Sequence, residues 1–165
     1  MIDRRVDPLL LLTPNTNQLA YQIFFKKKPK QVTKFPKEPS LSSLKKKLTN
    51  IFNAYIRKRD TINGTFFICI SCNQPKPLNQ MNAGHYFAAG HNEAIRYDEP
   101  NVNGQCIQCN KFLHGNQIEY TKGMLRKYGQ KTIDLLEIRR HNLSKLTKFE
   151  VNMLIDIYTK RLKQL

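Results

Sequence analysis

The sequence has no long hydrophobic run. No apolar segment approaches the roughly 20 residues that a helix needs to span a bilayer. Four leucines at residues 9–12 make a run too short for the core of a signal peptide, because Pro14 and polar residues follow at once. We therefore expect no membrane partner and a reducing, intracellular compartment.

Acidic residues are also scarce. The chain has 12 Asp and Glu against 28 Lys and Arg, which gives a formal net charge of +16 at pH 7. Such a charge attracts polyanions, with DNA or RNA as the first candidate and acidic lipid as the second. Because no segment could span a bilayer, we expect the partner to be nucleic acid.

Cysteines are few, and all four follow one pattern. Cys69 and Cys72 form a C-x-x-C pair, and Cys106 and Cys109 form a second pair at the same spacing. A tight turn lets both thiolates of a pair reach one cation, so two pairs match a closed tetrahedral zinc site. The alternatives are two disulfides, or four buried thiols without metal. A reducing compartment favours structural zinc.

The length of 165 residues suits one folded domain with a modest core. Residues 1–39 are basic and interrupted by prolines, so we predict an extended arm with a short strand near residues 20–25. The arm serves either solubility or non-specific phosphate contact. Residues 40–165 are predicted to form the folded domain.

A basic helix is predicted from residue 40, capped by Ser40 or Ser42. Apolar residues recur along residues 41–56 at helical spacing. The opposite face is either solvated or contacts nucleic-acid phosphates. Its cations are Lys45, Lys46, Lys47, Arg57, Lys58 and Arg59.

The remaining pattern predicts an α+β fold. Strands are expected over residues 65–70 and around His85, and residues 92–97 are either a returning strand or an irregular loop. Three helices are expected in the C-terminal half: residues 117–128 stopped by Gly129, residues 132–140, and a last helix opened by the capping box Thr147–Glu150.

Three polar residues between and after the cysteine pairs could carry chemistry. A strand bears His85, a loop bears Asn101, and Asn110 follows the second pair at the start of a helix. This order is the layout of a ββα-metal nuclease finger. There, a neutral imidazole takes a proton from water and a divalent cation neutralises charge on the phosphate.

The chain resembles the phage NinG (Rap) recombination-endonuclease family, a branch of the HNH and endonuclease VII type of nuclease. The resemblance covers about residues 45–130. The matching segments are residues 69–72, 83–86, Gly90, 96–99, Asn101, 105–110, 115–116 and Tyr120.

This resemblance implies a zinc-stapled ββα-metal core with His85 as general base. It implies Asn110 as a ligand of catalytic Mg²⁺ or Mn²⁺, and Asn101 as the middle residue of the motif, bracing its loop. The expected activity is metal-dependent hydrolysis of phosphodiester bonds in DNA, on branched recombination intermediates, in the host cytoplasm. The resemblance is also compatible with a homodimer.

One position departs from the family. Many relatives carry an acidic metal ligand just before the base histidine, where this chain has Gly84. Another group must then complete the metal shell: Asp98, Glu99, His114 or Asn116. Among these, His114 would share a helix face with Asn110 if the helix persists that far.

Plainer interpretations remain open for each residue. His85 could be a buried structural histidine, Asn110 a helix cap, and His114 a stabiliser of a helix C-terminus. Arg96 is either a salt-bridge partner or a phosphate ligand. The alternative functions are a zinc-stabilised nucleic-acid-binding protein without catalysis, or an HNH restriction or packaging nuclease.

Overall fold

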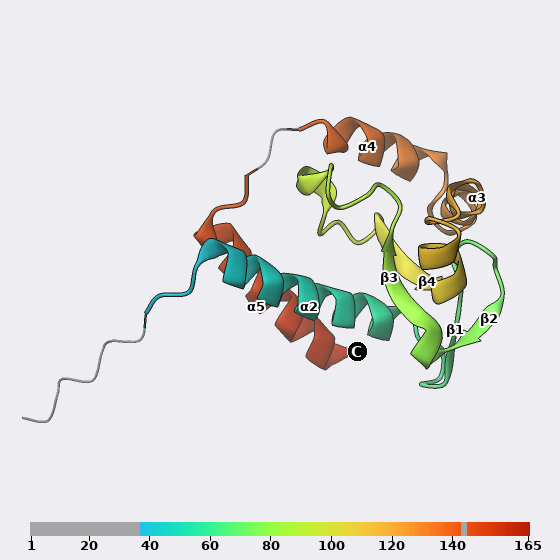
Figure 1. Cartoon of the computed structure of the whole chain (residues 1–165), viewed down its shortest axis with the longest axis horizontal. Coiled ribbons are helices and arrows are strands. Elements are labelled where there is room, and N and C mark those ends of the chain that lie inside the picture. Colours follow the sequence, from blue (N-terminus) through green and yellow to red (C-terminus); the bar gives the residue numbers. More distant parts are fainter. Residues whose placement is uncertain (1–36, 143–144) are drawn as a thin grey trace, which may run out of the picture. The chain divides into compact units, whose positions relative to one another are not determined.

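The computed structural model describes residues 37–142 and 145–165, and residues 39–165 form one compact unit (Figure 1). Most of the predicted arm, including the strand near residues 20–25, lies outside the described residues. The fold is mixed, with small sheets and several helices. The helices and strands are α2 (Leu41–Arg59), β1 (Phe66–Ile68), β2 (Pro75–Pro77), β3 (Met81–His85), β4 (Val102–Cys106), α3 (Gln117–Tyr128), α4 (Gln130–Arg140) and α5 (Lys148–Gln164).

Two antiparallel strand pairs bring the cysteine segments together. Strand β1 pairs with β2, and β3 pairs with β4 in a register that sets Met81 opposite Cys106 and His85 opposite Val102. The predicted strands near residues 65–70 and His85 are therefore confirmed. Residues 92–97 are not the returning strand; they contain the short 3₁₀ helix Glu93–Ile95.

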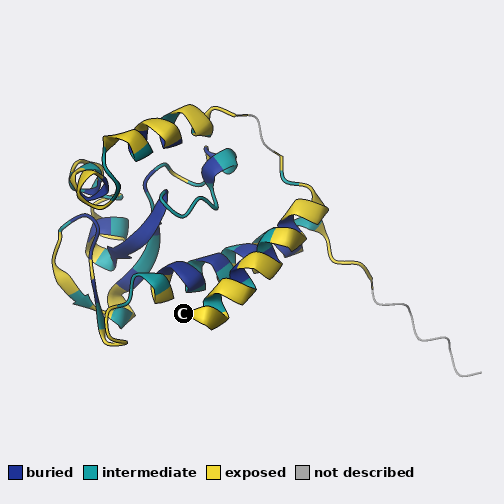
Figure 2. Cartoon of the chain, turned by 180° about the vertical axis from the view of Figure 1, so that it is seen from behind, coloured by how far each residue is buried: buried dark blue, intermediate teal, exposed yellow. Residues whose placement is uncertain are grey.

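Helix α2 is packed against α5, and the two run side by side in Figure 1. The α2 N-terminus is capped by Ser40, whose Oγ accepts a hydrogen bond from the Ser43 N–H at 3.2 Å. The rings of Phe52 and Tyr158 meet edge to face, with centroids 4.7 Å apart. Figure 2 shows the buried face of α2 turned towards the strands. The shared core consists of Leu44, Leu48, Phe52, Tyr55, Ile56, Val102, Val151, Ile155 and Tyr158.

Helices α3 and α4 lie on the other side of the β3–β4 pair (Figure 1). Gly129 ends α3 at Tyr128, as predicted, with a φ of 77°. A Cβ at Gly123 would lie 1.9 Å from the Ile70 carbonyl oxygen, so α3 needs glycine to approach the first cysteine loop. Helix α4 begins at Gln130, two residues before the prediction. The β3–β4 pair is thus held between two helical layers.

The capping box of α5 is confirmed, because Thr147 and Glu150 exchange the expected hydrogen bonds. Among the helices of the described residues, none has the length and apolar character that crossing a bilayer requires.

Candidate functional site

The four cysteines meet at one point. Cys69 and Cys72 follow β1, Cys106 ends β4, and Cys109 lies in the π-helical turn Gln108–Phe112. Their sulfur atoms all lie within 4.8 Å of one another. Within residues 37–142 and 145–165, no other group of three or more His, Cys, Asp or Glu side chains could hold a metal ion. Four thiolates at this separation fit a structural metal such as zinc.

Hydrogen-bond donors surround these sulfur atoms. The backbone N–H of Cys106 donates to Cys69 Sγ at 3.3 Å, and that of Cys109 donates to Cys106 Sγ at 3.4 Å. The Asn116 amide donates to Cys109 Sγ at 3.5 Å. Burial nevertheless raises the pKa of the Cys69 thiol to about 12. A bound cation is the group that would keep this thiol deprotonated at neutral pH.

His85 is the last residue of β3 and is half-buried. One ring nitrogen, Nε2, lies 3.0 Å from the Arg96 carbonyl oxygen. Burial lowers the pKa of His85 below its ordinary value, although this hydrogen bond opposes the shift. The ring is therefore neutral at pH 7. Because Nε2 donates its proton to the carbonyl, Nδ1 carries the free lone pair.

Asn101 braces the loop between β3 and β4. Its fully buried amide accepts from the Phe87 N–H at 2.9 Å and donates to the Phe87 and Ile95 carbonyls at 3.2 and 3.1 Å. These contacts occupy both ends of the amide, which fits the expected role of bracing the loop. By holding residues 86–101, it also fixes the Arg96 carbonyl that orients His85.

Asn110 lies directly after Cys109 in the π-helical turn and is half-buried. That turn ends at Phe112, and the chain then takes left-handed φ values at His114 (48°), Gly115 (92°) and Asn116 (45°). The helix therefore does not persist to His114, and the condition for a helix face shared with Asn110 is not met. His114 is exposed on the loop before α3.

The other candidate metal ligands are engaged elsewhere. Asp98 pairs with Arg139 at 2.9 Å, and burial raises its pKa. Glu99 pairs with Arg161 and accepts from the Tyr55 hydroxyl at 2.8 Å. These contacts tie the loop to α2, α4 and α5, and Asn116 donates to the cysteine site. Of the candidate ligands, Asn110 and His114 remain.

Gln105 occupies the space where an acid at position 84 would point. A Cβ on Gly84 would lie 2.3 Å from Gln105 Oε1. Gln105 is fully buried and donates to Ser71 Oγ at 2.7 Å and to the Gly115 carbonyl at 2.6 Å. Glycine at this position is thus a packing requirement. The sequence signalled Gln105 only as the neighbour of Cys106.

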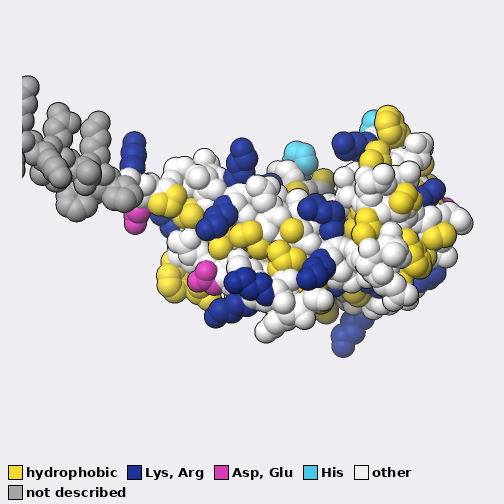
Figure 3. Space-filling view, turned by 90° about the horizontal axis from the view of Figure 1, so that it is seen from below, with side chains coloured by type: hydrophobic (Ala, Val, Ile, Leu, Met, Phe, Trp, Pro, Cys, Tyr) yellow, Lys and Arg dark blue, Asp and Glu magenta, His cyan; other side chains and the backbone are white. Residues whose placement is uncertain are grey.

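The basic face of α2 is divided between exposed and engaged cations. Lys46, Lys47, Arg57 and Lys58 are exposed, whereas Lys45 pairs with Glu93. Figure 3 shows many Lys and Arg side chains on one face and few acidic ones. A hollow of about 340 Å³ adjoins the helix. It is lined by Ser42, Lys45, Lys46, Thr49, Asn50 and Arg96. Arg96, whose carbonyl oxygen contacts His85, is thus also part of the lining of this basic hollow.

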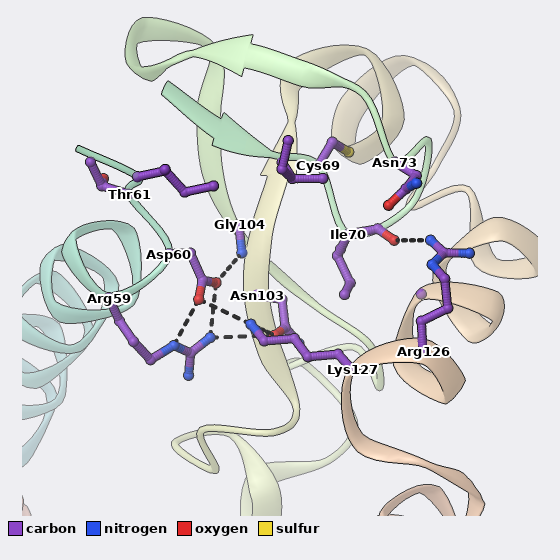
Figure 4. Close-up of a pocket in the computed structure, with 13 residues that line it drawn as sticks. Arg59, Asp60, Thr61, Cys69, Ile70, Asn73, Asn103, Gly104, Arg126 and Lys127 are labelled. Atoms are coloured by element: carbon purple, nitrogen blue, oxygen red, sulfur yellow. Dashed lines mark hydrogen bonds and ion pairs between the residues drawn. The ribbon is translucent and has the colours of Figure 1, made fainter. Parts of the chain in front are cut away.

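Arg59, one of the cations predicted to contact nucleic acid, is bound within the fold. Its guanidinium donates two hydrogen bonds of 2.9 Å to Asp60 and one of 2.9 Å to the Val102 carbonyl. Asp60 also accepts from Lys127 at 3.0 Å and from the Gly104 N–H at 2.7 Å (Figure 4). This network joins α2, β4 and α3. Sequence reasoning missed the role of Asp60, because two of its partners, Gly104 and Lys127, are distant along the chain.

Comparisons with known proteins assign the family. The family model described as Bacteriophage Lambda NinG protein matches residues 16–165. Protein ninG of Escherichia phage 933W is 34% identical over 113 residues, which are 68% of this chain and 53% of that protein. Protein ninG of Escherichia phage lambda is 33% identical over 113 residues, with shares of 68% and 52%. Protein ninG of Salmonella phage P22 is 32% identical over 113 residues, which are 68% of this chain and 53% of that protein.

The chain spans about half the length of these curated relatives. No solved structure matches it. The family model covers most of the sequence, including all of the folded unit. The chain therefore belongs to the family of the bacteriophage lambda NinG protein.

Proposed function

We propose that this protein is a metal-dependent DNA endonuclease of the HNH type, which hydrolyses phosphodiester bonds in branched recombination intermediates. The observation that carries the proposal is the setting of His85. A neutral imidazole ends a strand of a short antiparallel pair, and a backbone carbonyl 3.0 Å away fixes its ring. The second strand leads directly into the cysteine site and Asn110.

In this proposal His85 is the general base. Its Nδ1 lone pair accepts a proton from the attacking water, and the Arg96 carbonyl, which accepts a hydrogen bond from Nε2–H, stabilises the resulting imidazolium. The lowered pKa supports the role, because the base must be unprotonated at neutral pH. The buried Asn101 amide holds the loop that supplies this carbonyl.

The catalytic cation, Mg²⁺ or Mn²⁺, would be held by Asn110, the scissile phosphate and water. When bound, it would neutralise charge on the phosphate and on the leaving oxygen. An amide oxygen is a neutral ligand, and no acid fits at position 84 because Gln105 fills that space. The protein alone should therefore bind this cation weakly, and DNA should complete the site.

Substrate binding would use the exposed cations of α2 and the hollow lined by Lys45, Lys46 and Arg96. Phosphate contacts of this kind position a duplex without reading its sequence. Arg96 connects the two regions in this proposal, because it lines the hollow and its carbonyl oxygen contacts His85.

A second candidate function is nucleic-acid binding without catalysis. It is favoured by the engagement of Asp98 and Glu99 in ion pairs and by the glycine at position 84. A cleavage assay separates the two functions, using linear, flap and four-way DNA with and without Mg²⁺. We expect Mg²⁺-dependent cleavage that is faster on branched DNA. Binding to all three substrates without cleavage in Mg²⁺ or Mn²⁺ would leave the second candidate.

A further inference from the structure

We propose that Phe112 and Leu113 form an apolar tip that stacks against an unpaired base of the DNA substrate. This inference rests on the proposed function and names the feature of branched DNA that the site would recognise. Unpaired bases expose a π-face, and stacking on an aromatic side chain is a common way for proteins to hold them.

The tip is strongly exposed. Phe112 is 67% exposed and Leu113 is 48% exposed, although the two are adjacent in sequence. Neither belongs to the three hydrophobic clusters found among the described residues. Two consecutive large apolar side chains that stay in contact with water add no hydrophobic stabilisation to the fold. A contact with a partner therefore accounts for them better than packing does.

The backbone beneath the tip is held at several points. The Leu113 N–H donates to the Gln108 carbonyl at 2.9 Å, and the Gly115 N–H donates to the Cys109 carbonyl at 2.9 Å. The buried Gln105 amide donates to the Gly115 carbonyl at 2.6 Å. The cysteine site therefore fixes the loop, and an aromatic side chain on a fixed loop loses little conformational entropy on stacking.

Left-handed residues follow the tip. His114 and Asn116 have φ values of 48° and 45°, in a region that residues other than glycine rarely adopt. The Asn116 N–H donates to the Leu113 carbonyl at 2.8 Å, and its side chain donates to Cys109 Sγ at 3.5 Å. This sharp reversal ends the π-helical turn and leaves the preceding two side chains projecting.

The charge around the tip selects an anionic partner. Lys111 precedes Phe112, His114 follows Leu113, and residues 100–118 contain no Asp or Glu. A second copy of the chain would bring like charge to this surface, which opposes self-association through it. DNA offers phosphates for Lys111 and a base for Phe112. Phe112 ends the same π-helical turn that contains the proposed metal ligand Asn110.

A fully paired duplex has no exposed base for the tip to contact. The contribution of Phe112 should thus be specific to DNA with unpaired positions, such as branch points and gaps. In contrast, the lysines of α2 would bind any DNA through its phosphates.

Binding assays with the full zinc-loaded chain, without added Mg²⁺, test this inference. Two DNA probes of equal length are used, one fully paired and one with a short gap that carries 2-aminopurine as an unpaired base. The variants are Phe112→Ala, Phe112→Tyr and the matched control Phe149→Ala. Phe149 lies on α5 and is 72% exposed. Zinc content and thermal unfolding check that each variant is folded.

Phe112→Ala should weaken binding to the gapped probe about 5- to 150-fold, the usual worth of one stacked base, and change binding to the paired probe less than about twofold. It should also abolish the change in 2-aminopurine fluorescence. Phe112→Tyr should keep the wild-type affinity for the gapped probe and the fluorescence change. Phe149→Ala should alter neither the affinity nor the fluorescence change. If Phe112→Ala keeps the wild-type preference for the gapped probe, or loses affinity equally for both probes, the stacking inference is overturned and the proposed function is not. A wild-type chain that binds neither probe overturns the proposed function as well. If Phe112→Ala loses binding to anionic vesicles but keeps its affinity for both probes, the tip would be assigned to membranes.

Discussion

Removal of the Asp60 carboxylate tests the network that joins α2, β4 and α3. The Asp60 side chain is only 11% exposed and that of Arg59 only 18%. The carboxylate accepts hydrogen bonds from Arg59, Lys127 and the Gly104 N–H. Asp60→Ala would leave the Arg59 guanidinium and the Gly104 N–H buried without this partner. Breaking a buried ion pair from one side costs about 3–5 kcal/mol, and we expect about 3 because Lys127 is partly exposed.

Urea unfolding followed by circular dichroism measures this change. Asp60→Asn should fall between the wild type and Asp60→Ala, since an amide can still accept from the Gly104 N–H. The matched control is Asp156→Asn on the exposed side of α5, where we expect a change within about 0.5 kcal/mol. A loss below about 1 kcal/mol for Asp60→Ala would refute the buried-network reasoning.

The effect has a defined pH dependence. Burial by itself raises the pKa of Asp60, but hydrogen bonds and charge from Arg59 and Lys127 outweigh it and hold the pKa below its ordinary value. The stabilisation of the folded state by the Asp60 carboxylate is therefore fully present above the pKa of about 3.9 in the unfolded chain. It is lost as the pH falls through the lower pKa of the folded state. The difference between wild type and Asp60→Asn should stay constant from pH 8 to about pH 4 and shrink only below that.

Three further predictions concern the metals and the DNA. Elemental analysis should give about one zinc per chain, and Cys106→Ser should lose the metal and unfold the domain, whereas a stable, zinc-free and active variant would contradict the cysteine site. Charge reversal at Lys46 and Lys47 should weaken binding to all DNA alike and flatten its salt dependence by about one unit per lost phosphate contact; unchanged affinity at low salt would show a merely solvated face. Asn110→Ala should abolish cleavage, which in the wild type needs millimolar Mg²⁺, and unchanged cleavage would show that Asn110 is not a metal ligand. A raised Mg²⁺ requirement in His114→Ala would make His114 a further ligand.

Local signals were sufficient to predict the helices. Ser40 caps α2, Gly129 ends α3, and the Thr147–Glu150 box opens α5, as their sequence patterns indicated. Caps act through hydrogen bonds within a few residues, so the sequence contains the whole interaction. The paired C-x-x-C spacing likewise predicted the meeting of the four cysteines.

The parts that were missed depend on contacts far along the chain. Strand β4 contains Asn103, Gly104 and Gln105, a polar pattern that does not suggest a strand buried throughout. These polar side chains are buried because Lys127, Tyr128, Ser71 and the Gly115 carbonyl bind them. Arg59 likewise has the sequence pattern of a surface cation, but the distant Val102 carbonyl accepts a hydrogen bond from it.

Single-turnover cleavage of branched DNA by His85→Ala tests whether His85 is the general base. The matched control is His91→Ala, which changes an exposed histidine in the same loop region. Zinc content and DNA affinity are measured in parallel. We expect His85→Ala to keep both while its cleavage rate falls about 10²- to 10⁴-fold. His91→Ala should cleave like the wild type. Undiminished cleavage by His85→Ala, or a loss of folding and binding in proportion to cleavage, would contradict the assignment of His85 as the general base.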